Sequence, residues 1–153
     1  MFIYRVCDAF EQAKVEYAVV GGYAVALHGA VRGTIDLDIV LAINEKNFSV
    51  AEEVLNRIGL SARLPVRAKE VFKFRKEYIE KKNLIAWNFY NPKDALEVVD
   101  IIITHDLKKM KKVVLKSGSH KLSVLSIPDL IKMKRESGRP QDLEDARVLE
   151  RLK

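Results

Sequence analysis

The clearest alternation of apolar and polar residues lies in the stretch 34–41, which reads TIDLDIVL. Its four apolar residues at odd positions fall on one side of an extended chain, whereas Thr34, Asp36 and Asp38 fall on the other. A period of two residues is typical of a β-strand. The stretch therefore predicts a strand that carries two carboxylates on one face.

Other short apolar runs are bounded by turn residues and also predict strands. The first of them ends at the glycine pair Gly21-Gly22, and Asn91-Pro92 predicts the turn between two later ones. The segments predicted as strands are 17–20, 34–41, 71–75, 84–90, 96–103 and 122–125. We expect these strands to form a mixed sheet.

Six further segments predict helices, most of them because apolar residues recur at a spacing of three to four. These segments are 2–14, 23–30, 45–58, 106–112, 127–137 and 140–152. Ser126 is an N-cap candidate for the fifth helix, Gly138 ends that helix, and Pro140 opens the last one. Together with the strands, the helices predict an α/β or α+β fold in which a mixed β-sheet is flanked by helices.

The chain has 153 residues, the usual size of one domain, and its 48% hydrophobic residues are enough for a core. We expect a single domain over residues 1–153, with the C-terminal helices 127–152 packed on it. No apolar run approaches the roughly 20 residues that cross a bilayer, and no signal-peptide pattern begins the chain, so no membrane partner is expected. One cysteine, Cys7, forms no internal disulfide, which favours a cytoplasmic location.

Three aspartates carry the chemistry that stands out. Asp36 and Asp38 lie two residues apart on one predicted strand, and Asp100 lies in another very apolar strand, VVDIII. Carboxylates on one apolar face repel one another and are costly to bury without a positive charge. A divalent cation supplies that charge, and oxygen ligands suit Mg²⁺ or Mn²⁺. If the two strands are neighbours, the three carboxylates converge and suit a two-metal site.

Gly21 and Gly22 lie between a predicted strand and a predicted helix, where glycine lets the backbone approach a phosphate closely. Such a pair is otherwise an ordinary tight turn. The run GGYAVALHGAVRGTIDLDIVL, however, resembles the signature of the polymerase-beta-like nucleotidyltransferase superfamily, which has a glycine pair at a helix start, a spacer, and Asp-x-Asp on a strand. Many members have serine where this chain has Gly22, a difference that keeps the backbone donors.

Within that superfamily the chain most resembles the small bacterial group that includes the AbiEii-type toxins. In that group the glycine pair is followed by Arg-x-Thr and Asp-x-Asp, which correspond here to Arg32, Thr34, Asp36 and Asp38. The C-terminal segment DLIKMKRESGRPQDLEDARVLERL is also similar to the group, which has a lysine, then Gly-Arg-Pro, then an Asp-rich helix there. Residues 42–95 match no motif.

The resemblance implies a metal-dependent enzyme that moves a nucleoside monophosphate from a nucleoside triphosphate to an acceptor hydroxyl. Asp36, Asp38 and Asp100 would bind Mg²⁺ or Mn²⁺, and Lys134 and Arg139 would reach the β- and γ-phosphates. The acceptor stays open between a tRNA end or other RNA, a protein hydroxyl and a small molecule. A toxin of this kind would also have a cognate antitoxin protein as a partner.

Several of these residues have a structural interpretation as well. Arg32 is equally a surface arginine in a loop, and Thr34 has ordinary strand propensity. Lys134 and Arg139 belong equally to a solvated helix face. The acidic residues of 142–145 suit the dipole at the start of the last helix, which is the favoured interpretation for them.

Two other classes of function remain open. The same fold without turnover would be a catalytically silent nucleotide-binding or partner-binding module. The net charge of +6 and the lysines of 108–121 favour an RNA binder, although such runs are more often a solvated surface. Trp87, Phe89 and Tyr90 would stack on bases or, as residues of a strand, belong to the core.

Overall fold

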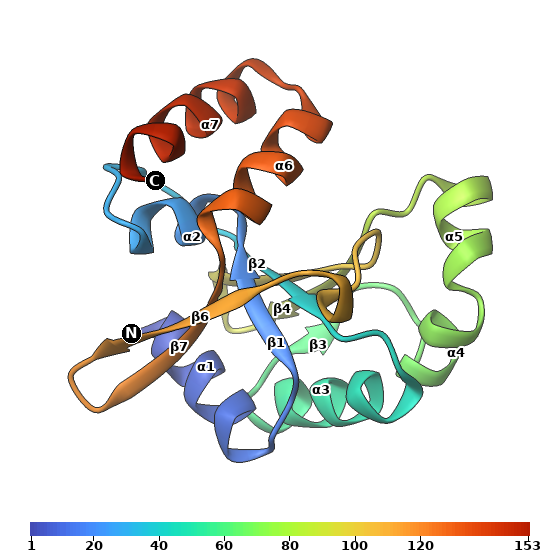
Figure 1. The fold of residues 1–153 in the computed structure, drawn as a ribbon. Coiled ribbons are helices and arrows are strands. Elements are labelled where there is room, and N and C mark those ends of the chain that lie inside the picture. Colours follow the sequence, from blue (N-terminus) through green and yellow to red (C-terminus); the bar gives the residue numbers. More distant parts are fainter.

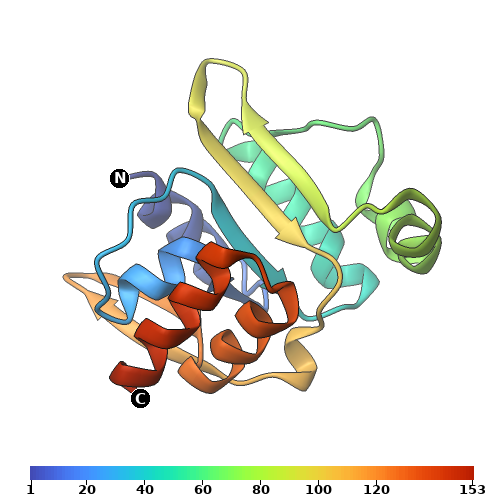
Figure 2. The ribbon, with the colours of Figure 1, turned by 90° about the horizontal axis from the view of Figure 1, so that it is seen from above.

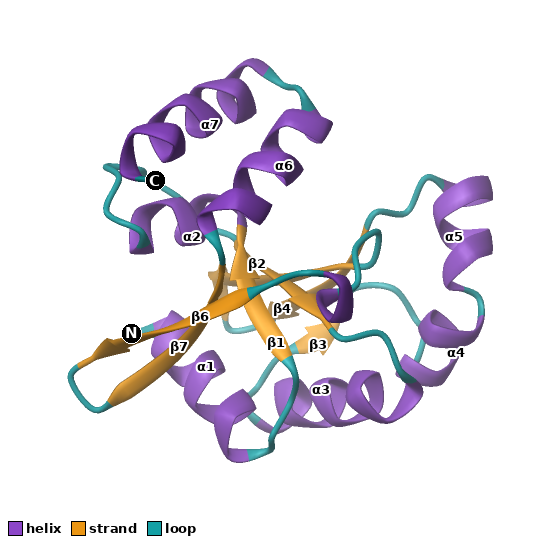
Figure 3. Ribbon diagram, viewed as in Figure 1, coloured by secondary structure: helices purple, strands orange, loops and turns teal.

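The computed structural model describes residues 1–153, and its centre is a mixed seven-stranded sheet with the strand order β3-β4-β5-β2-β1-β7-β6. The strands are β1 (Tyr17–Val20), β2 (Leu37–Leu41), β3 (Ser61–Ala62), β4 (Ala86–Asn91), β5 (Asp94–Ile102), β6 (Lys112–Ser117) and β7 (His120–Leu125). Figure 3 shows the strands as one layer with helices around it. The predicted mixed sheet flanked by helices is therefore confirmed.

The middle of the sheet joins segments that lie far apart in the chain. β1 pairs antiparallel with β2, β2 pairs parallel with β5, and β1 pairs parallel with β7. Two hairpins, β4–β5 and β6–β7, extend the sheet on its two sides. The parallel pairing of β2 with β5 brings the strand after the glycine pair next to the strand of Asp100.

The helices lie on both sides of the sheet (Figure 1). They are α1 (Phe2–Gln12), α2 (Gly21–Leu27), α3 (Glu45–Arg57), α4 (Ala68–Lys73), α5 (Arg75–Lys82), α6 (Ile127–Ser137) and α7 (Pro140–Leu152). In Figure 1, α1 and α3 lie below the sheet, and α2, α6 and α7 lie above it. Seen from above in Figure 2, β4 and β5 are not covered by α2, α6 or α7.

The core lies mainly between the sheet and the helices α1 and α3. Its largest fully buried side chains include Trp87, Phe89, Phe48, Phe10 and Tyr17. The rings of Phe48 and Trp87 stack 5.9 Å apart, and Trp87 meets Phe89 edge-on at 4.8 Å. The core interpretation therefore holds for Trp87 and Phe89.

Three sequence-based assignments of secondary structure were wrong. The segment 71–75 was expected to be a strand, but it lies in α4 and the start of α5. Val71 is buried, and α4 packs against α3. The expected helix 106–112 is only a 3-10 turn at Leu107–Lys109, after which β6 begins. The strand expected from residue 34 begins at Leu37.

The start of β2 has a physical explanation. Val20 is the last residue of β1 and pairs with Asp38, and the chain then turns into α2. On the other side, the pairing with β5 begins at Leu37. Residues 34–36 thus have no neighbouring strand and stay irregular. No helix of the structure is long and apolar enough to cross a membrane.

Candidate active site

Asp38 and Asp100 are partners in the register of the parallel strands β2 and β5. Neighbouring strands lie about 4.8 Å apart, and paired residues project from the same face, so both carboxylates lie on one face of the sheet. Asp36 lies two residues before Asp38, in the exposed bend that precedes β2. The predicted convergence of carboxylates from two strands is therefore present for Asp38 and Asp100. Asp36 lies at the outer edge of this pair.

Burial and repulsion raise the pKa of the Asp38 carboxyl to about 7, because the group is largely desolvated and faces the charges of Asp100 and Asp36. The positive charges of Lys134 and Arg139 oppose this effect only in part. At neutral pH the site therefore holds closely spaced carboxylates that lack sufficient positive charge.

Burial also raises the pKa of the Asp100 carboxyl, and the charge of Asp36 adds to the effect. A hydrogen bond from Asn88 and the charge of Arg63 act in the opposite direction. The Nδ2 group of Asn88 donates this bond to Oδ1 of Asp100, its register partner on β4. Asn88 was not singled out from the sequence, because the β-bulge at Tyr90 and Asn91 shifts the register of the hairpin.

None of the three carboxylates is neutralised by an ion pair. The ion pairs beside the site all use Asp142 or Asp145, which bind Lys134, Arg32 and Arg139. Asp38 also has no hydrogen-bond donor from the protein, whereas Asp100 has only Asn88. The carboxylates are therefore free to bind a ligand in the cleft.

The cleft has a volume of about 900 Å³ and opens between the sheet and the helices α6 and α7. Its lining includes all three carboxylates and five of the six residues assigned to nucleotide binding from the sequence. These residues are Gly22, Arg32, Thr34, Asp36, Asp38, Asp100, Lys134 and Arg139. A second hollow of about 420 Å³ adjoins it and includes Gly21. The structure thus brings the whole predicted set to one place.

The glycine pair packs directly against this set. A β-carbon placed on Gly21 would overlap the carboxylate of Asp38, and one on Gly22 would lie 2.9 Å from Oγ1 of Thr34. Gly21 also has a φ of +67°, which side chains other than glycine rarely adopt. Gly21 therefore makes room for the Asp38 carboxylate and Gly22 makes room for Thr34, a role that was not expected from the sequence.

Lys134 is buried rather than part of a solvated helix face. Its ammonium lies 2.9 Å from Oδ2 of Asp145 and 3.4 Å from Oδ1 of Asp142, and both carboxylates are also buried. Asp142 does lie in the first turn of α7, as the helix-dipole interpretation expects, but both aspartates also bind Lys134. They join α7 to α6 through a buried charge network beside the cleft.

The remaining predicted residues surround this network. Nε of Arg32 donates to Asp145 over 3.2 Å, so Arg32 binds an aspartate of α7 rather than one of the three site carboxylates. Nε of Arg139 donates to Asp142 over 2.7 Å, although Arg139 itself is exposed. The hydroxyl of Thr34 donates to the backbone oxygen of Asp36 over 3.4 Å and not to a carboxylate.

The donor set suits a small divalent cation, because oxygen ligands that lack a positive partner attract such ions. Asp38, without a donor from the protein, and Asp100 would form the inner pair. No group of three or more His, Cys, Asp or Glu residues is arranged closely enough to hold a metal ion as it stands. A third ligand would therefore require the exposed bend of Asp36 to approach the pair.

The cysteine and two of the three histidines lie away from this chemistry. Cys7 is buried in the core. Nε2 of His28 hydrogen-bonds to the backbone oxygen of Leu125, which fits a packed histidine. His120 pairs with Asp8 at 2.8 Å. These residues therefore have structural partners.

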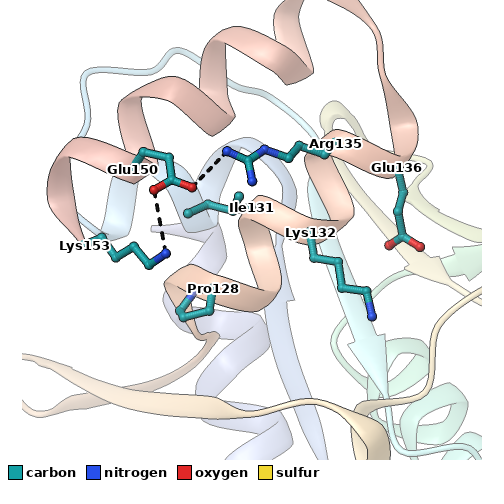
Figure 4. Close-up of a pocket in the computed structure, with 7 residues that line it drawn as sticks. All are labelled: Pro128, Ile131, Lys132, Arg135, Glu136, Glu150 and Lys153. Atoms are coloured by element: carbon teal, nitrogen blue, oxygen red, sulfur yellow. Dashed lines mark hydrogen bonds and ion pairs between the residues drawn. The ribbon is translucent and has the colours of Figure 1, made fainter.

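A further hollow, between α6 and α7, contains no group suited to catalysis (Figure 4). Most of its lining is charged, and Glu150 pairs with Arg135 at 2.9 Å and with Lys153 at 3.7 Å. Surface ion pairs of this kind contribute little to the stability of the fold. The lining contains no cysteine, serine or histidine and no cluster of carboxylates. The candidate site is therefore the cleft of Asp38 and Asp100.

No family model and no curated protein sequence matches this chain. Among solved structures, the lincomycin-bound lincosamide antibiotic adenylyltransferase LnuA is similar over 99% of this chain and 96% of its own, with a TM-score of 0.62 and 16% identity. A putative nucleotidyltransferase from Thermotoga maritima is similar over 97% of this chain and 89% of its own, with a TM-score of 0.59 and 18% identity.

Two further structures show the same likeness. The antibiotic-resistance factor ANT(2'')-Ia is similar over 97% of this chain and 80% of its own chain, with a TM-score of 0.62 and 11% identity. An antigenic nucleotidyltransferase-like protein from Paracoccidioides brasiliensis is similar over 96% of this chain and 72% of its own chain, with a TM-score of 0.60 and 14% identity. Since these structures match nearly the whole chain at TM-scores near 0.6, this chain has the nucleotidyltransferase fold.

Proposed function

We propose that the chain is a nucleotidyltransferase, which moves a nucleoside monophosphate from a nucleoside triphosphate to an acceptor hydroxyl. The observation that carries this proposal is the register pairing of Asp38 with Asp100 on one face of a nucleotidyltransferase fold. Two desolvated carboxylates with raised pKa values and no ion pair are costly, and a purely structural role does not explain them.

In this reaction the acceptor oxygen forms a bond to the α-phosphorus, the bond from that phosphorus to the bridging oxygen breaks, and pyrophosphate leaves. Asp36, Asp38 and Asp100 would hold Mg²⁺ or Mn²⁺, which supplies positive charge to the triphosphate and lowers the pKa of the acceptor hydroxyl. Asp100 is also the candidate acceptor for the hydroxyl proton. Asn88 orients the Asp100 carboxylate by its hydrogen bond.

The positive side chains at the cleft suit a triphosphate. Arg139 is exposed, and its guanidinium keeps donors beyond those that bind Asp142. Lys134 is held by two aspartates, yet its charge still acts on Asp38. We assign direct contact with the phosphates to Arg139. Lys134 would contribute positive charge to the site without touching the phosphates. Gly21, Gly22, Arg32 and Thr34 line the same space.

For the acceptor, we propose a macromolecule of the kind implied by the resemblance to AbiEii-type toxins, with tRNA, other RNA or a protein as candidates. The net charge of +6 supports an anionic partner. An antitoxin-like protein partner is part of the same proposal.

A small-molecule acceptor is the second candidate. Two similar structures concern drug-modifying proteins: LnuA is bound to lincomycin, and ANT(2'')-Ia is in complex with adenylyl-2''-tobramycin. In Figure 2, α2, α6 and α7 do not cover β4 or β5, the strand that carries Asp100, and this arrangement favours neither class of acceptor.

The test is incubation of the purified chain with each labelled triphosphate, Mg²⁺ or Mn²⁺, and cell extract, followed by separation of RNA, protein and small molecules. We expect one fraction to become labelled, and Asp38→Asn and Asp100→Asn to abolish the label. Asp94→Asn is the matched control, because Asp94 is exposed at the start of β5, away from the carboxylate pair.

A catalytically silent module is the alternative of a different class. It predicts no transfer from any triphosphate while nucleotide binding persists. Calorimetry with Mg²⁺ and each triphosphate separates these outcomes. Full label transfer by Asp38→Asn would contradict the assignment of the site.

A further inference from the structure

A hollow of about 420 Å³ leads away from Asp38 towards the C-terminal ends of β5 and α6. It joins the larger cleft at Asp38 and the neighbouring cations, and Ile85, Ile102 and Asp142 also line both spaces. One side of the hollow is an apolar wall that begins at the junction with Ile85 and Ile102 and continues away from the cleft. The apolar residues are Val20, Ile85, Ile102, Leu130 and Met133.

Ile85 is the residue of this wall that most needs an explanation. Its side chain is 62% exposed, although it stands just before β4 and beside a cleft lined with charges. Ile102 and Met133 are half-buried and extend the apolar surface across β5 and α6. An apolar surface next to a polar cleft is typical of a site for an amphipathic ligand.

The far end of the hollow is polar. Thr104, His105 and Glu136 line it, and the Thr104 hydroxyl lies 2.8 Å from Nδ1 of His105. Nε2 of His105 lies 3.5 Å from Oε1 of Glu136. This is the only contact of Glu136 with a basic side chain, and Glu136 is exposed at the end of the apolar walls.

We propose that this hollow, the base pocket, binds the nucleobase of the donor triphosphate, and that Glu136 selects among bases. The inference rests on the proposed function, and it deepens it by assigning the part of the donor that is not phosphate. A nucleotide has a flat, largely apolar ring at one end and an anion at the other. The base pocket offers apolar walls, and Lys134 and Arg139 stand at its junction with the cleft.

Glu136 would read the outer edge of the base. An ionised carboxylate only accepts hydrogen bonds, so it binds an amino group and repels a carbonyl oxygen at the same place. Bases that carry an exocyclic amino group, such as adenine and cytosine, are therefore favoured. The corresponding oxo bases, hypoxanthine and uracil, leave the carboxylate unpaired.

The first experiment separates base from phosphate. Ile85→Ala reduces the apolar wall and is expected to weaken binding of ATP in Mg²⁺ about fivefold or more. Binding of inorganic tripolyphosphate, which has no base, is expected to stay within twofold of wild type. Both ligands are measured by calorimetry. An equal loss for both ligands, or no loss for ATP, would overturn the pocket assignment.

The second experiment compares ligands that differ only by amino and oxo groups: ATP with inosine triphosphate, and CTP with UTP. For the wild type we expect the amino member of each pair to bind about tenfold more tightly. In Glu136→Gln the ratio is expected to fall to about twofold, because the amide both donates and accepts.

Glu150→Gln is the matched control, because it removes the same charge from a glutamate that also contacts basic side chains. Figure 4 shows Glu150 and Glu136 at opposite ends of the hollow between α6 and α7. The control is expected to keep the wild-type preference. Wild-type ratios near one, or ratios that Glu136→Gln leaves unchanged, would overturn the role of Glu136.

The outcomes also separate this inference from the function on which it rests. Label transfer with no base preference and no effect of Ile85→Ala overturns the base pocket and leaves the nucleotidyltransferase proposal standing. An effect of Ile85→Ala on the KM of the acceptor alone would assign the hollow to the acceptor and overturn the inference. If no triphosphate binds at all, both proposals fail.

Discussion

Gly21 and Asp38 share one space: a β-carbon on Gly21 would overlap the Asp38 carboxylate and lie 2.9 Å from the Asp38 Cβ. The residues belong to different elements, since Gly21 is the first residue of α2 and Asp38 is the second residue of β2. The glycine therefore sets where the carboxylate can lie. This steric relationship ties the two halves of the sequence signature together.

Gly21→Ala is expected to displace the Asp38 carboxylate and to strain a backbone with a φ of +67°. We expect a loss of stability of roughly 2–4 kcal/mol, made of about 1 kcal/mol of backbone strain and the overlap with Asp38. Urea unfolding measures the loss, and calorimetry with Mn²⁺ is expected to show weaker metal binding.

Gly118→Ala is the control for this change. Gly118 has a φ of +59°, but nothing lies within 4 Å of its added β-carbon. This variant is expected to lose only the stability that the backbone strain costs, about 1 kcal/mol, and to keep the metal affinity of the wild type. Equal effects of the two substitutions would show that the approach of Asp38 does not matter.

The raised pKa of Asp38 predicts an unusual pH dependence for the metal-free protein. The carboxyl has a pKa of 3.8 when unfolded and about 7 when folded, so the folded state binds more protons between these values. Stability in chelator is therefore expected to fall as pH rises from about 4 to about 7, by on the order of 4 kcal/mol from this group. Asp38→Asn should remove this part of the slope and be more stable than wild type at pH 7.5.

Thermal melts in EDTA across this pH range measure the effect. Asp94→Asn, at an exposed carboxylate of the same sheet, is expected to keep the wild-type slope. A wild-type stability that rises steadily from pH 4 to pH 7, with no difference in Asp38→Asn, would refute the electrostatic strain.

The spacing of apolar residues predicted helices and strands correctly where one face of the element packs against the core. The helix Ile127–Ser137 and the strand Tyr17–Val20 have the predicted bounds, since capping residues and glycines mark their ends. It failed at 71–75, because a short apolar run does not distinguish a strand from a buried helix. It also missed β6, an edge strand in which two lysines flank only three consecutive apolar residues.

The carboxylates of the site were predictable because an apolar strand makes an aspartate conspicuous. The residues around these carboxylates were not predictable from the sequence. Asn88 opposes Asp100 only because of the hairpin register, and a bulge at Asn91 hides that register from simple counting. The burial of Asp142 and Asp145 depends on how α7 packs on α6, which the sequence of one helix does not contain.

Asn88→Ala is expected to remove the only protein donor to Asp100 while keeping the fold. The carboxylate then loses its fixed orientation, and we expect Mn²⁺ affinity to fall about tenfold, in line with the loss of a side chain that orients a ligand. Calorimetry measures the affinity. Asn91→Ala removes a comparable bond from the same strand to Glu97 and serves as the control. The assignment fails if the two variants bind Mn²⁺ alike.

Lys134→Met tests the buried charge network of α6 and α7. The substitution keeps the bulk of the side chain but leaves the buried carboxylates of Asp142 and Asp145 without the cation that they share. Arg139 and Arg32 each bind only one of them. An uncompensated buried charge predicts a loss of about 3–5 kcal/mol in urea unfolding.

Arg135→Met provides the comparison, because Arg135 is the next residue of α6 and pairs with Glu150 on the exposed side. Exposed pairs contribute at most about 1 kcal/mol, so this variant should unfold close to wild type. Adding Asp142→Asn and Asp145→Asn to Lys134→Met removes the stranded charges and should recover part of the lost stability. If Lys134→Met and Arg135→Met cost the same, the network does not hold α7 in place, and the cleft wall it forms must be stabilised by apolar packing alone.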